Sequence, residues 1–298
     1  MKKFLAFILI LSMASMMLVS CGSKEYTLGI GAAVTNDGTT KVETTVASVV
    51  LDADGKIVAC RIDALDFNTV GDDEGNVSVE ANFTTKRELG DDYGMVKYGV
   101  SDKEWYTQAE YFEGVVVGKT VAEVSGIWAQ GDEELIAGCT IDAGGFVKAV
   151  VAACKSEHKV SFKSGADIKV GLSVIGSGES KDGAVTYAAD TAATVVAGDK
   201  VVAAVIDSLE ATVEIDDEAN ATGFTYKGTK LEQGDNYGMV AYAGAVAEWY
   251  AQAQAFANTA VGKAPADVAN LATEGIAGCT IGVEGYHKAL VKAVSYIR

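Results

Sequence analysis

An internal duplication constrains this 298-residue chain more than any other feature of its sequence. The segment 86–96, KRELGDDYGMV, returns at 230–240 as KLEQGDNYGMV. The hexapeptide IAGCTI at 136–141 returns unchanged at 276–281. A repeat of more than about a hundred residues is too long for a solenoid unit and has the size of a globular domain. The chain is therefore expected to fold as two homologous domains in tandem.

The borders of the two domains follow from where the similarity starts and stops. We place repeat one at 26–154 and repeat two at 167–298, with a short polar linker at 155–166. The spacing of matched residues is constant from 86 to 119 and then shortens by a few residues before the hexapeptide. A length change of this kind belongs in a surface loop.

Local patterns predict the same elements in both repeats. Valine-rich strands are expected at 46–51 and 56–62 around an Asp-Gly turn at 52–55, and again at 194–197 and 200–206 around a turn at 198–199. Helical spacing of apolar residues predicts helices at 104–113, 120–127, 145–154, 264–271 and 285–296. Strands followed by helices indicate an α+β fold, in which each domain has a small antiparallel sheet with packed helices.

The first residues have the layout of an export signal. Lys2 and Lys3 precede an apolar run, and the segment ends at Leu18-Val19-Ser20-Cys21. The apolar region is too short and wrongly flanked for a membrane span. It resembles a bacterial lipoprotein signal, with a signal peptide at 1–20, a lipid on Cys21 and a tether at 21–25. The alternative is an ordinary secretory signal in which Cys21 is incidental.

Charge and composition exclude several classes of partner. The formal net charge is −17, and removal of Lys2 and Lys3 with the signal leaves −19. Such a chain repels phosphate backbones, so nucleic acid is excluded as a partner. It is also repelled by anionic lipid, so anchoring is expected to depend on the attached lipid.

Cysteine and histidine usage argues against metal sites and a disulfide framework. The cysteines after Cys21 are Cys60, Cys139, Cys154 and Cys279, and only two of them occupy matching positions. The chain has two histidines and no Cys-x-x-Cys pair, so no zinc or haem site is expected. Neither a Ser-His-Asp nor a Cys-His set is repeated, so we expect no catalytic function.

Thr140 and Thr280 stand out because each lies in an identical hexapeptide shortly before a predicted helix. Unpaired N–H groups and the dipole at such a helix start favour an anion such as a phosphate. Gly138 and Gly278 would let a bulky group approach the backbone closely. The alternative is a threonine that only caps a helix or a turn. Two copies in an identical context favour a bound or attached group.

Each repeat resembles the FMN-binding domain in which flavin mononucleotide is esterified through its phosphate to a threonine. The acceptor motif of that family is Asp-x-x-Ser/Thr-Gly-Ala-Thr. Segments 134–140, ELIAGCT, and 274–280, EGIAGCT, share its glycine and its final threonine. Glutamate, alanine and cysteine replace the aspartate, the hydroxyl residue and the alanine. A lipobox followed by two such domains is similar to flavin-bearing lipoproteins of Gram-positive extracellular electron transfer.

The resemblance implies a redox carrier and not an enzyme. An FAD-dependent FMN transferase would attach two FMN groups covalently, one to Thr140 and one to Thr280. The protein would lie on the outer face of the cytoplasmic membrane of a Gram-positive bacterium. Electrons would arrive from a membrane quinone-linked donor and leave to an extracellular acceptor such as iron(III).

Other duplicated residues are candidates for a cofactor pocket. Aromatic or sulfur side chains could pack on a flavin ring, whereas the helical spacing of Trp105 and Trp249 favours core packing. Cys139 and Cys279 are expected to be small buried residues beside the acceptors. The remaining candidates form a turn expected to face the threonine loop: Lys86, Glu88, Tyr93, Gly94 and Met95, with Lys230, Glu232, Tyr237, Gly238 and Met239.

Two other functions remain open from the sequence. The protein could hold flavin or another small ligand reversibly, in which case denaturation would release it. It could also be a structural surface lipoprotein in which Thr140 and Thr280 are caps.

Overall fold

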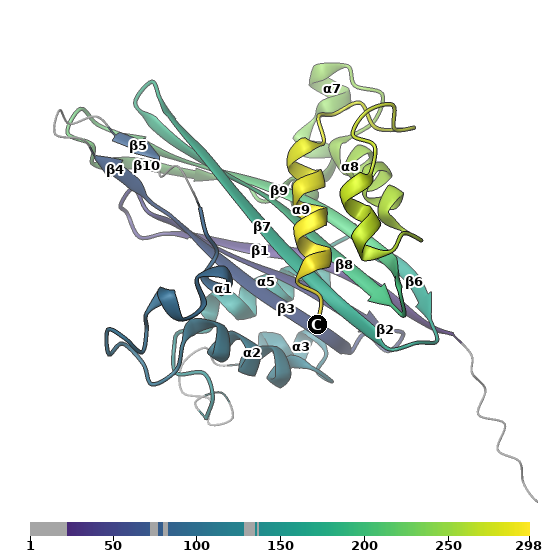
Figure 1. Ribbon diagram of the computed structural model, residues 1–298. Coiled ribbons are helices and arrows are strands. Elements are labelled where there is room, and N and C mark those ends of the chain that lie inside the picture. Colours follow the sequence, from purple (N-terminus) through teal and green to yellow (C-terminus); the bar gives the residue numbers. More distant parts are fainter. Residues whose placement is uncertain (1–22, 72–76, 80–82, 128–134, 136) are drawn as a thin grey trace, which may run out of the picture.

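Two four-stranded antiparallel sheets form the centre of the molecule. The computed structural model describes residues 23–71, 77–79, 83–127, 135 and 137–298 (Figure 1). The predicted signal peptide and Cys21 lie outside the described residues, as does most of the loop before Thr140. In the first sheet the strand order is β3-β2-β1-β6, with bounds β1 (Lys24–Asn36), β2 (Val42–Asp52), β3 (Ile57–Phe67) and β6 (Val160–Ser164).

The second sheet repeats the three-stranded meander with longer strands, but its fourth strand, β10, pairs with β9 at the edge opposite to the one that β6 occupies in the first sheet. Its order is β10-β9-β8-β7, with bounds β7 (Ile168–Lys181), β8 (Ala184–Ala197), β9 (Lys200–Ile215) and β10 (Ala221–Tyr226). A small ladder of β4 (Thr69–Gly71) and β5 (Val77–Val79) follows β3 in repeat one. Both predicted hairpins are confirmed as β2–β3 and β8–β9. The sequence analysis did not predict β1 and β7.

The segment 155–166, expected to be a linker, contains β6 and is part of the first sheet. β6 pairs antiparallel with β1, with Leu28 opposite Val160 and Lys24 opposite Ser164. A similar contact occurs in repeat two. The backbone of Arg298, the last residue, exchanges hydrogen bonds of 3.0 and 3.3 Å with that of Val170 in β7, the counterpart of β1. The polar composition of the segment hid a short edge strand, whose outer residues are expected to be polar.

The helices match the predicted order and lie after the strands in each repeat, which confirms the α+β class. The predicted helix at 264–271 is the shorter 3₁₀ helix η4 (Pro265–Asn270). Among the described residues, no helix is long and apolar enough to cross a membrane. The other helices are α1 (Lys86–Leu89), η1 (Gly90–Tyr93), α2 (Trp105–Val116), α3 (Val121–Ser125), α5 (Gly144–Lys155), α6 (Lys230–Gln233), η2 (Gly234–Tyr237), α7 (Met239–Ala243), α8 (Trp249–Ala257), η3 (Asn258–Ala260) and α9 (Glu284–Ser295).

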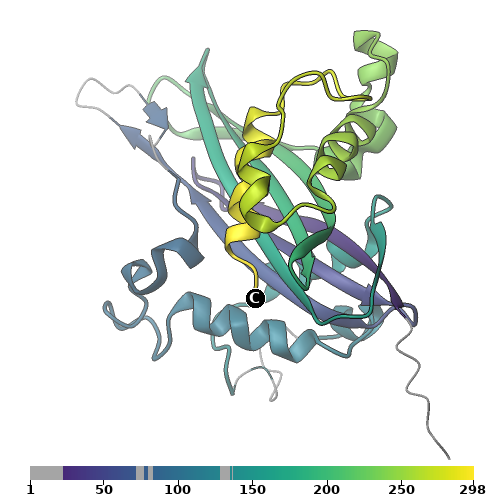
Figure 2. The same ribbon diagram turned by 45° about the vertical axis from the view of Figure 1, so that its right-hand side comes forward.

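The two sheets pack face to face, and the helices of each repeat cover the outer faces (Figures 1 and 2). Alternate residues of the first sheet, such as Leu28 and Phe67, share one core with Leu172 and Tyr187 of the second sheet. The rings of Phe67 and Tyr187 are 5.0 Å apart. Since strand side chains alternate between faces, the opposite faces contact α5 and α9. The two repeats therefore form one sandwich with a common core.

Helices α5 and α9 lie directly on the strands beneath them. A Cβ atom on Gly29 would lie 2.3 Å from the carbonyl oxygen of Ala153, and one on Gly171 would lie 2.0 Å from that of Ala293. Glycine is required at both positions because the helix backbone takes the space of a side chain. This close approach fixes where the loops before α5 and α9, which carry Thr140 and Thr280, leave the sheet.

Candidate functional site

Thr140 and Thr280 occupy the same place in the two repeats. Each is exposed, and each lies four residues before the first residue of a 12-residue helix, α5 or α9. The prediction of a threonine in a loop before a helix is confirmed. Neither threonine caps its helix, since Ala143 and Val283 are the N-cap residues. The helix-capping alternative is therefore wrong for both positions.

A buried glutamine holds each threonine in place. The Oε1 atom of Gln108 accepts hydrogen bonds from the backbone N–H of Thr140 at 2.7 Å and from its hydroxyl at 3.2 Å. Gln252 accepts the same two bonds from Thr280, at 2.8 and 2.9 Å. Both glutamine side chains belong to residues that are 0% exposed. Each threonine hydroxyl thus donates inward to the buried glutamine, while the threonine itself stays exposed.

The glutamines are themselves tied to the turn that follows the duplicated Tyr-Gly-Met segment. Gln108 donates from Nε2 to the hydroxyl of Ser101 at 3.1 Å and to the carbonyl of Lys103 at 3.0 Å. Gln252 donates to the carbonyl of Ala247 at 2.8 Å. These bonds connect the glutamines to residues 101–103 and 247, which follow the predicted turn segments at 86–95 and 230–239.

Two further duplicated contacts fix the Tyr-Gly-Met segment. The carboxylate of Glu104 accepts from the N–H groups of Met95 and Val96 at 3.0 and 3.1 Å. Glu248 does the same for Met239 and Val240, at 2.9 and 3.0 Å. Tyr106 and Tyr250 donate to Asp91 and Asp235, each at 3.1 Å. Residues at the start of α2 in repeat one, and of α8 in repeat two, thus bind both the Tyr-Gly-Met segment and the loop that carries the threonine.

The predicted lysine and tyrosine candidates lie next to one another. The ammonium of Lys86 is 5.1 Å from the centre of the Tyr93 ring, and that of Lys230 is 5.2 Å from the Tyr237 ring. Burial lowers the pKa of Lys86, but the Asp66 carboxylate at 3.0 Å and Tyr93 raise it overall. Both lysines therefore remain charged beside an aromatic face.

Glu88 and Glu232 serve a local structural purpose. Each closes a capping box, in which its carboxylate accepts from the N–H of Thr85 or Thr229 and its own N–H donates to that threonine hydroxyl. Glu88 also pairs with Lys292 at 2.9 Å. Both glutamates therefore serve to start a short helix, which explains why they occur in both repeats. Gly94 and Gly238 end the following 3₁₀ turns with φ of 81° and 77°.

The two cysteines in the hexapeptides are buried thiols, as expected. Cys139 is 2% and Cys279 is 9% exposed. Burial raises the pKa of Cys139 to about 11 and that of Cys279 above its usual value. The four cysteines within the described residues are free, and a neutral buried thiol is a poor nucleophile. Gly138 is buried against Tyr111, and Gly278 adopts a φ of +80°.

A hollow of about 360 Å³ opens beside the threonine loop of repeat one. Its lining includes Lys86, Tyr93 and Met95 from the predicted set, together with Trp105. Ile141, Asp142 and the first turn of α5 line another side, and strand residues that include Glu43 and Asp66 form the floor, so the hollow begins at the residue after Thr140. Trp105 packs edge to face on Phe146 at 5.5 Å and is 4% exposed, which confirms its place in the core.

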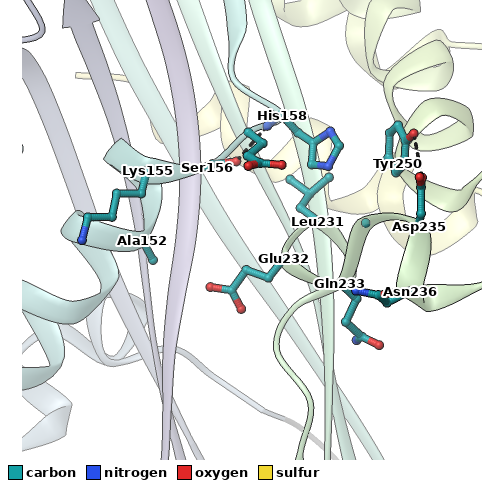
Figure 3. Close-up of a pocket in the computed structure, with 12 residues that line it drawn as sticks. Ala152, Lys155, Ser156, His158, Leu231, Glu232, Gln233, Asp235, Asn236 and Tyr250 are labelled. Atoms are coloured by element: carbon teal, nitrogen blue, oxygen red, sulfur yellow. Dashed lines mark hydrogen bonds between the residues drawn. The ribbon is translucent and has the colours of Figure 1, made fainter.

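A second hollow, of about 580 Å³, lies at the junction of the two repeats (Figure 3). Its lining combines residues 155–158 with residues 231–236 and Tyr250. The rings of His158 and Tyr250 are 4.2 Å apart. Within the described residues, no group of three His, Cys, Asp or Glu side chains could hold a metal ion. Of the predicted site residues, this hollow contains Glu232 alone.

Sequence reasoning missed the residues that act directly on the acceptor threonines. Gln108 and Gln252 are such residues, and so are Ser101, 3.3 Å from the Thr140 hydroxyl, and Lys103, which donates to the carbonyl of Ala137 at 2.9 Å. The glutamines occupy matching positions three residues after Trp105 and Trp249, so the duplication itself carried their signal. Ser101 and Lys103 correspond to alanines in repeat two and gave no such signal.

Comparison with known proteins yields one partial relative. A chlorophenol reductase from Desulfitobacterium hafniense is 34% identical over 133 residues, which cover 38% of this chain and 40% of that protein. The chain thus spans well under half of the curated relative that it matches. No protein-family model and no solved structure matches the chain.

Proposed function

We propose that this protein is an extracytoplasmic electron-transfer lipoprotein that carries FMN esterified to Thr140 and to Thr280. The observation that carries the proposal is the duplicated pair of a buried glutamine and an exposed threonine hydroxyl. A fully buried amide that orients a surface hydroxyl is unnecessary for a solvated loop threonine. It is useful where that oxygen must be presented in one orientation to an incoming phosphorus atom.

The attachment requires a transferase and an FAD donor. The threonine Oγ forms a bond to the FMN phosphorus, the pyrophosphate bond of FAD breaks, AMP leaves, and the hydroxyl proton passes to solvent or to the transferase. Because Thr140 and Thr280 are exposed, the partner can reach both. The chain supplies the position of the oxygen and the transferase supplies the remaining chemistry, so this protein is a substrate and a carrier.

The surroundings of Thr140 fit such a group. A hollow of about 360 Å³ is within the usual size for a small-ligand site. It offers an aromatic and a sulfur side chain, Tyr93 and Met95, and the ammonium of Lys86. When attached, FMN would supply reversible acceptance and release of electrons. The chain would position its ring system and set the local charge, through Lys86 and the nearby carboxylates of Asp66 and Asp142.

The direction of electron flow follows the resemblance described above. A quinone-linked membrane donor would reduce the carrier, and an extracellular acceptor such as iron(III) would oxidise it. The similarity of part of the chain to a protein named as a reductase is compatible with a redox role. Lipid attachment at Cys21 would keep the carrier on the outer face of the cytoplasmic membrane.

The test is the flavin content of denatured protein. The full chain is produced with an extracytoplasmic FMN transferase, precipitated in acid, washed, and measured by mass spectrometry of intact protein and of proteolytic peptides. We expect one FMN on the peptide of each threonine. Thr140→Ala and Thr280→Ala should each remove one, and the double variant should remove both. Thr39→Ala, at an exposed turn, is the matched control and should keep both.

Two results would contradict the proposal. Colourless protein recovered in the presence of an active transferase would remove the flavin altogether. Flavin that is present in native protein but lost on denaturation would favour reversible binding.

A further inference from the structure

The two ends of the sandwich, taken along the strands, carry different charge. Strand β1 begins at Lys24. The last residues of β6 and β2 lie opposite its start, since Ser164 pairs with Lys24 and Asp52 with Tyr26. In the second sheet the last residue of β8, Ala197, pairs in the same way with Ile168 at the start of β7. We call this the Lys24 end and define it by the strand ends and attached turns at 24–27, 52–57, 117–120, 161–169, 197–201 and 261–263.

The opposite end of the same strands is called the distal end. It holds the β1–β2, β7–β8 and β9–β10 turns and the end of β3, and in Figure 1 it lies on the left, where β4, β5 and β10 are labelled. Its residues are 35–43, 66–71, 178–185 and 213–221.

The Lys24 end is balanced in charge, whereas the distal end is strongly acidic. The Lys24 end contains seven lysines and five carboxylates: Lys24, Lys56, Lys119, Lys163, Lys169, Lys200 and Lys263, with Glu25, Asp52, Asp54, Asp167 and Asp199. The distal end contains two lysines and nine carboxylates: Lys41 and Lys181, with Asp37, Glu43, Asp66, Glu179, Asp182, Glu214, Asp216, Asp217 and Glu218. In a chain of net charge −17, this distribution leaves one end that an anionic surface does not repel.

An aromatic hollow lies at the Lys24 end. It has a volume of about 430 Å³ and is lined by Tyr26 and Phe162, whose rings stack at 5.5 Å, and by the paired Glu25 and Lys163. Tyr26 is half-buried, and Phe162 is 8% exposed. Tyrosine flanked by lysine is the composition that suits the boundary between water and lipid.

We infer that the Lys24 end is the surface by which this protein lies against the phospholipid bilayer. The inference rests on the lipid attachment at Cys21 that forms part of the proposed function. Cys21 precedes Lys24 by three residues, which span at most about 10 Å when extended. A lipid on Cys21 therefore brings this end within contact distance of the headgroups. The small excess of lysines over carboxylates at this end attracts anionic headgroups, whereas the acidic distal end is repelled.

This orientation places both acceptor threonines away from the membrane. Helix α5 starts with Gly145 against Thr45, in the distal half of β2, and ends with Ala153 against Gly29, nearer the Lys24 end. Helix α9 likewise runs from Gly285 against Asp190 to Ala293 against Gly171. Because Thr140 and Thr280 precede these helices, both would face the medium and not the bilayer.

The test uses depth-dependent quenching in the full lipidated chain. Tyr26→Trp places a reporter at the Lys24 end, and Tyr242→Trp, at a position 88% exposed on α7, places one near the second threonine loop. Each variant is reconstituted in vesicles of brominated phosphatidylcholine and phosphatidylglycerol, and the signal of the unsubstituted protein is subtracted. We expect at least about twofold stronger quenching for Tyr26→Trp, and a drop when Lys24, Lys56 and Lys200 are changed to Glu.

The controls and contrary outcomes are separate from the flavin question. Lys41→Glu with Lys181→Glu, at the distal end, should leave the quenching unchanged. Equal quenching of the two reporters, or stronger quenching of Tyr242→Trp, would overturn the inference, as would a mature chain that carries no lipid on Cys21. FMN content is measured on the same samples by absorbance, so loss of flavin with retained quenching would reject the carrier function and leave the membrane face intact.

Discussion

The two repeats hold their acceptor threonines in the same way but surround them differently. In both, a buried glutamine accepts from the threonine, and a glutamate of the same helix holds the neighbouring turn. The rims differ, because Ser101 and Lys103 of repeat one correspond to Ala245 and Ala247. The duplication therefore kept the contacts that position the oxygen and changed those that set charge around it.

A second difference lies beneath the turns. Asp63 and Asp207 are matching buried carboxylates that accept from the backbone at the start of α1 and α6. Asp63 has the guanidinium of Arg87 nearby, whereas Leu231 stands at the matching position in repeat two. Asp63 and Asp207 thus accept the same backbone hydrogen bonds, but among the described residues only Asp63 has a cation nearby. Experiments that measure the titration of each carboxylate can therefore distinguish the two repeats.

The largest expected effect is the pH dependence introduced by Asp207. Burial raises the pKa of Asp207 to about 7, although bonds from Thr229, Leu231 and Ser208 oppose this. Between about pH 4 and pH 7 the folded state binds a proton that the unfolded state releases, so the stability contribution falls as pH rises through this window. Asp207→Asn should abolish that fall, which amounts to roughly 2–4 kcal/mol.

Urea denaturation at several pH values measures the effect as a difference from the unsubstituted protein. The difference is needed because carboxylates with lowered pKa, such as Asp216, give a slope of opposite sign. Asp63→Asn should change the slope less, since Arg87 opposes the effect of burial there. A larger change of slope for Asp63→Asn than for Asp207→Asn would show that Arg87 is not the cause of the electrostatic difference between the repeats.

The next effect concerns the glutamines. Gln108→Leu removes bonds from Thr140 and Ile141 and to the Ser101 turn, whereas Gln252→Leu removes fewer. We expect destabilisation of about 2–3 kcal/mol for the first and about 1–2 kcal/mol for the second. Each should also slow flavin attachment at its own threonine by about tenfold, with the other threonine as an internal control. Equal loss at both threonines in either variant would show a global effect instead of positioning.

A smaller effect separates the two hexapeptide glycines. A Cβ on Gly138 would lie 2.1 Å from the ring of Tyr111, whereas one on Gly278 has ordinary space, 3.6 Å from Ala255, but needs a φ of +80°. Gly138→Ala should cost about 1–3 kcal/mol by overpacking, and Gly278→Ala about 1–2 kcal/mol by backbone strain.

Tyr111→Ala, which introduces the residue of repeat two, should relieve the cost of Gly138→Ala when the double variant is compared with Tyr111→Ala alone. Thermal or urea denaturation gives the comparison. Failure of the relief would mean that Tyr111 is not the obstacle.

The smallest effect is expected for the rim lysine. Lys103→Ala removes an exposed hydrogen bond to the carbonyl of Ala137, so stability should change by less than about 1 kcal/mol. The ratio of FMN attachment rates at Thr140 and Thr280 should shift by less than about fivefold, and Ala247→Lys should shift it in the opposite direction. Peptide mapping over a time course measures the ratio, and a shift in the same direction for both variants would argue against a local charge effect.

Much of the architecture could be predicted because its signals are local. The hairpins β2–β3 and β8–β9 are marked by valine-rich strands around short turns, and α5 and α9 by apolar periodicity. Strands β1 and β7 were not predicted, since glycines interrupt them where the helices approach closely, at Gly29 and Gly31 under α5 and at Gly171 under α9. The polar segment that forms β6 was taken for a linker because an edge strand needs no apolar outer face.

The sequence by itself determined that the chain has two copies of one α+β unit and that Thr140 and Thr280 are equivalent, since duplication and periodicity are written in the order of residues. Only the tertiary structure decided that the two sheets share one core and that Gln108 and Gln252 hold the threonines. It also decided that Asp207 lacks the cation available to Asp63. Hydrogen bonds and electrostatic interactions of this kind depend on distances of a few ångströms between residues far apart in the chain, and residue order alone does not specify them.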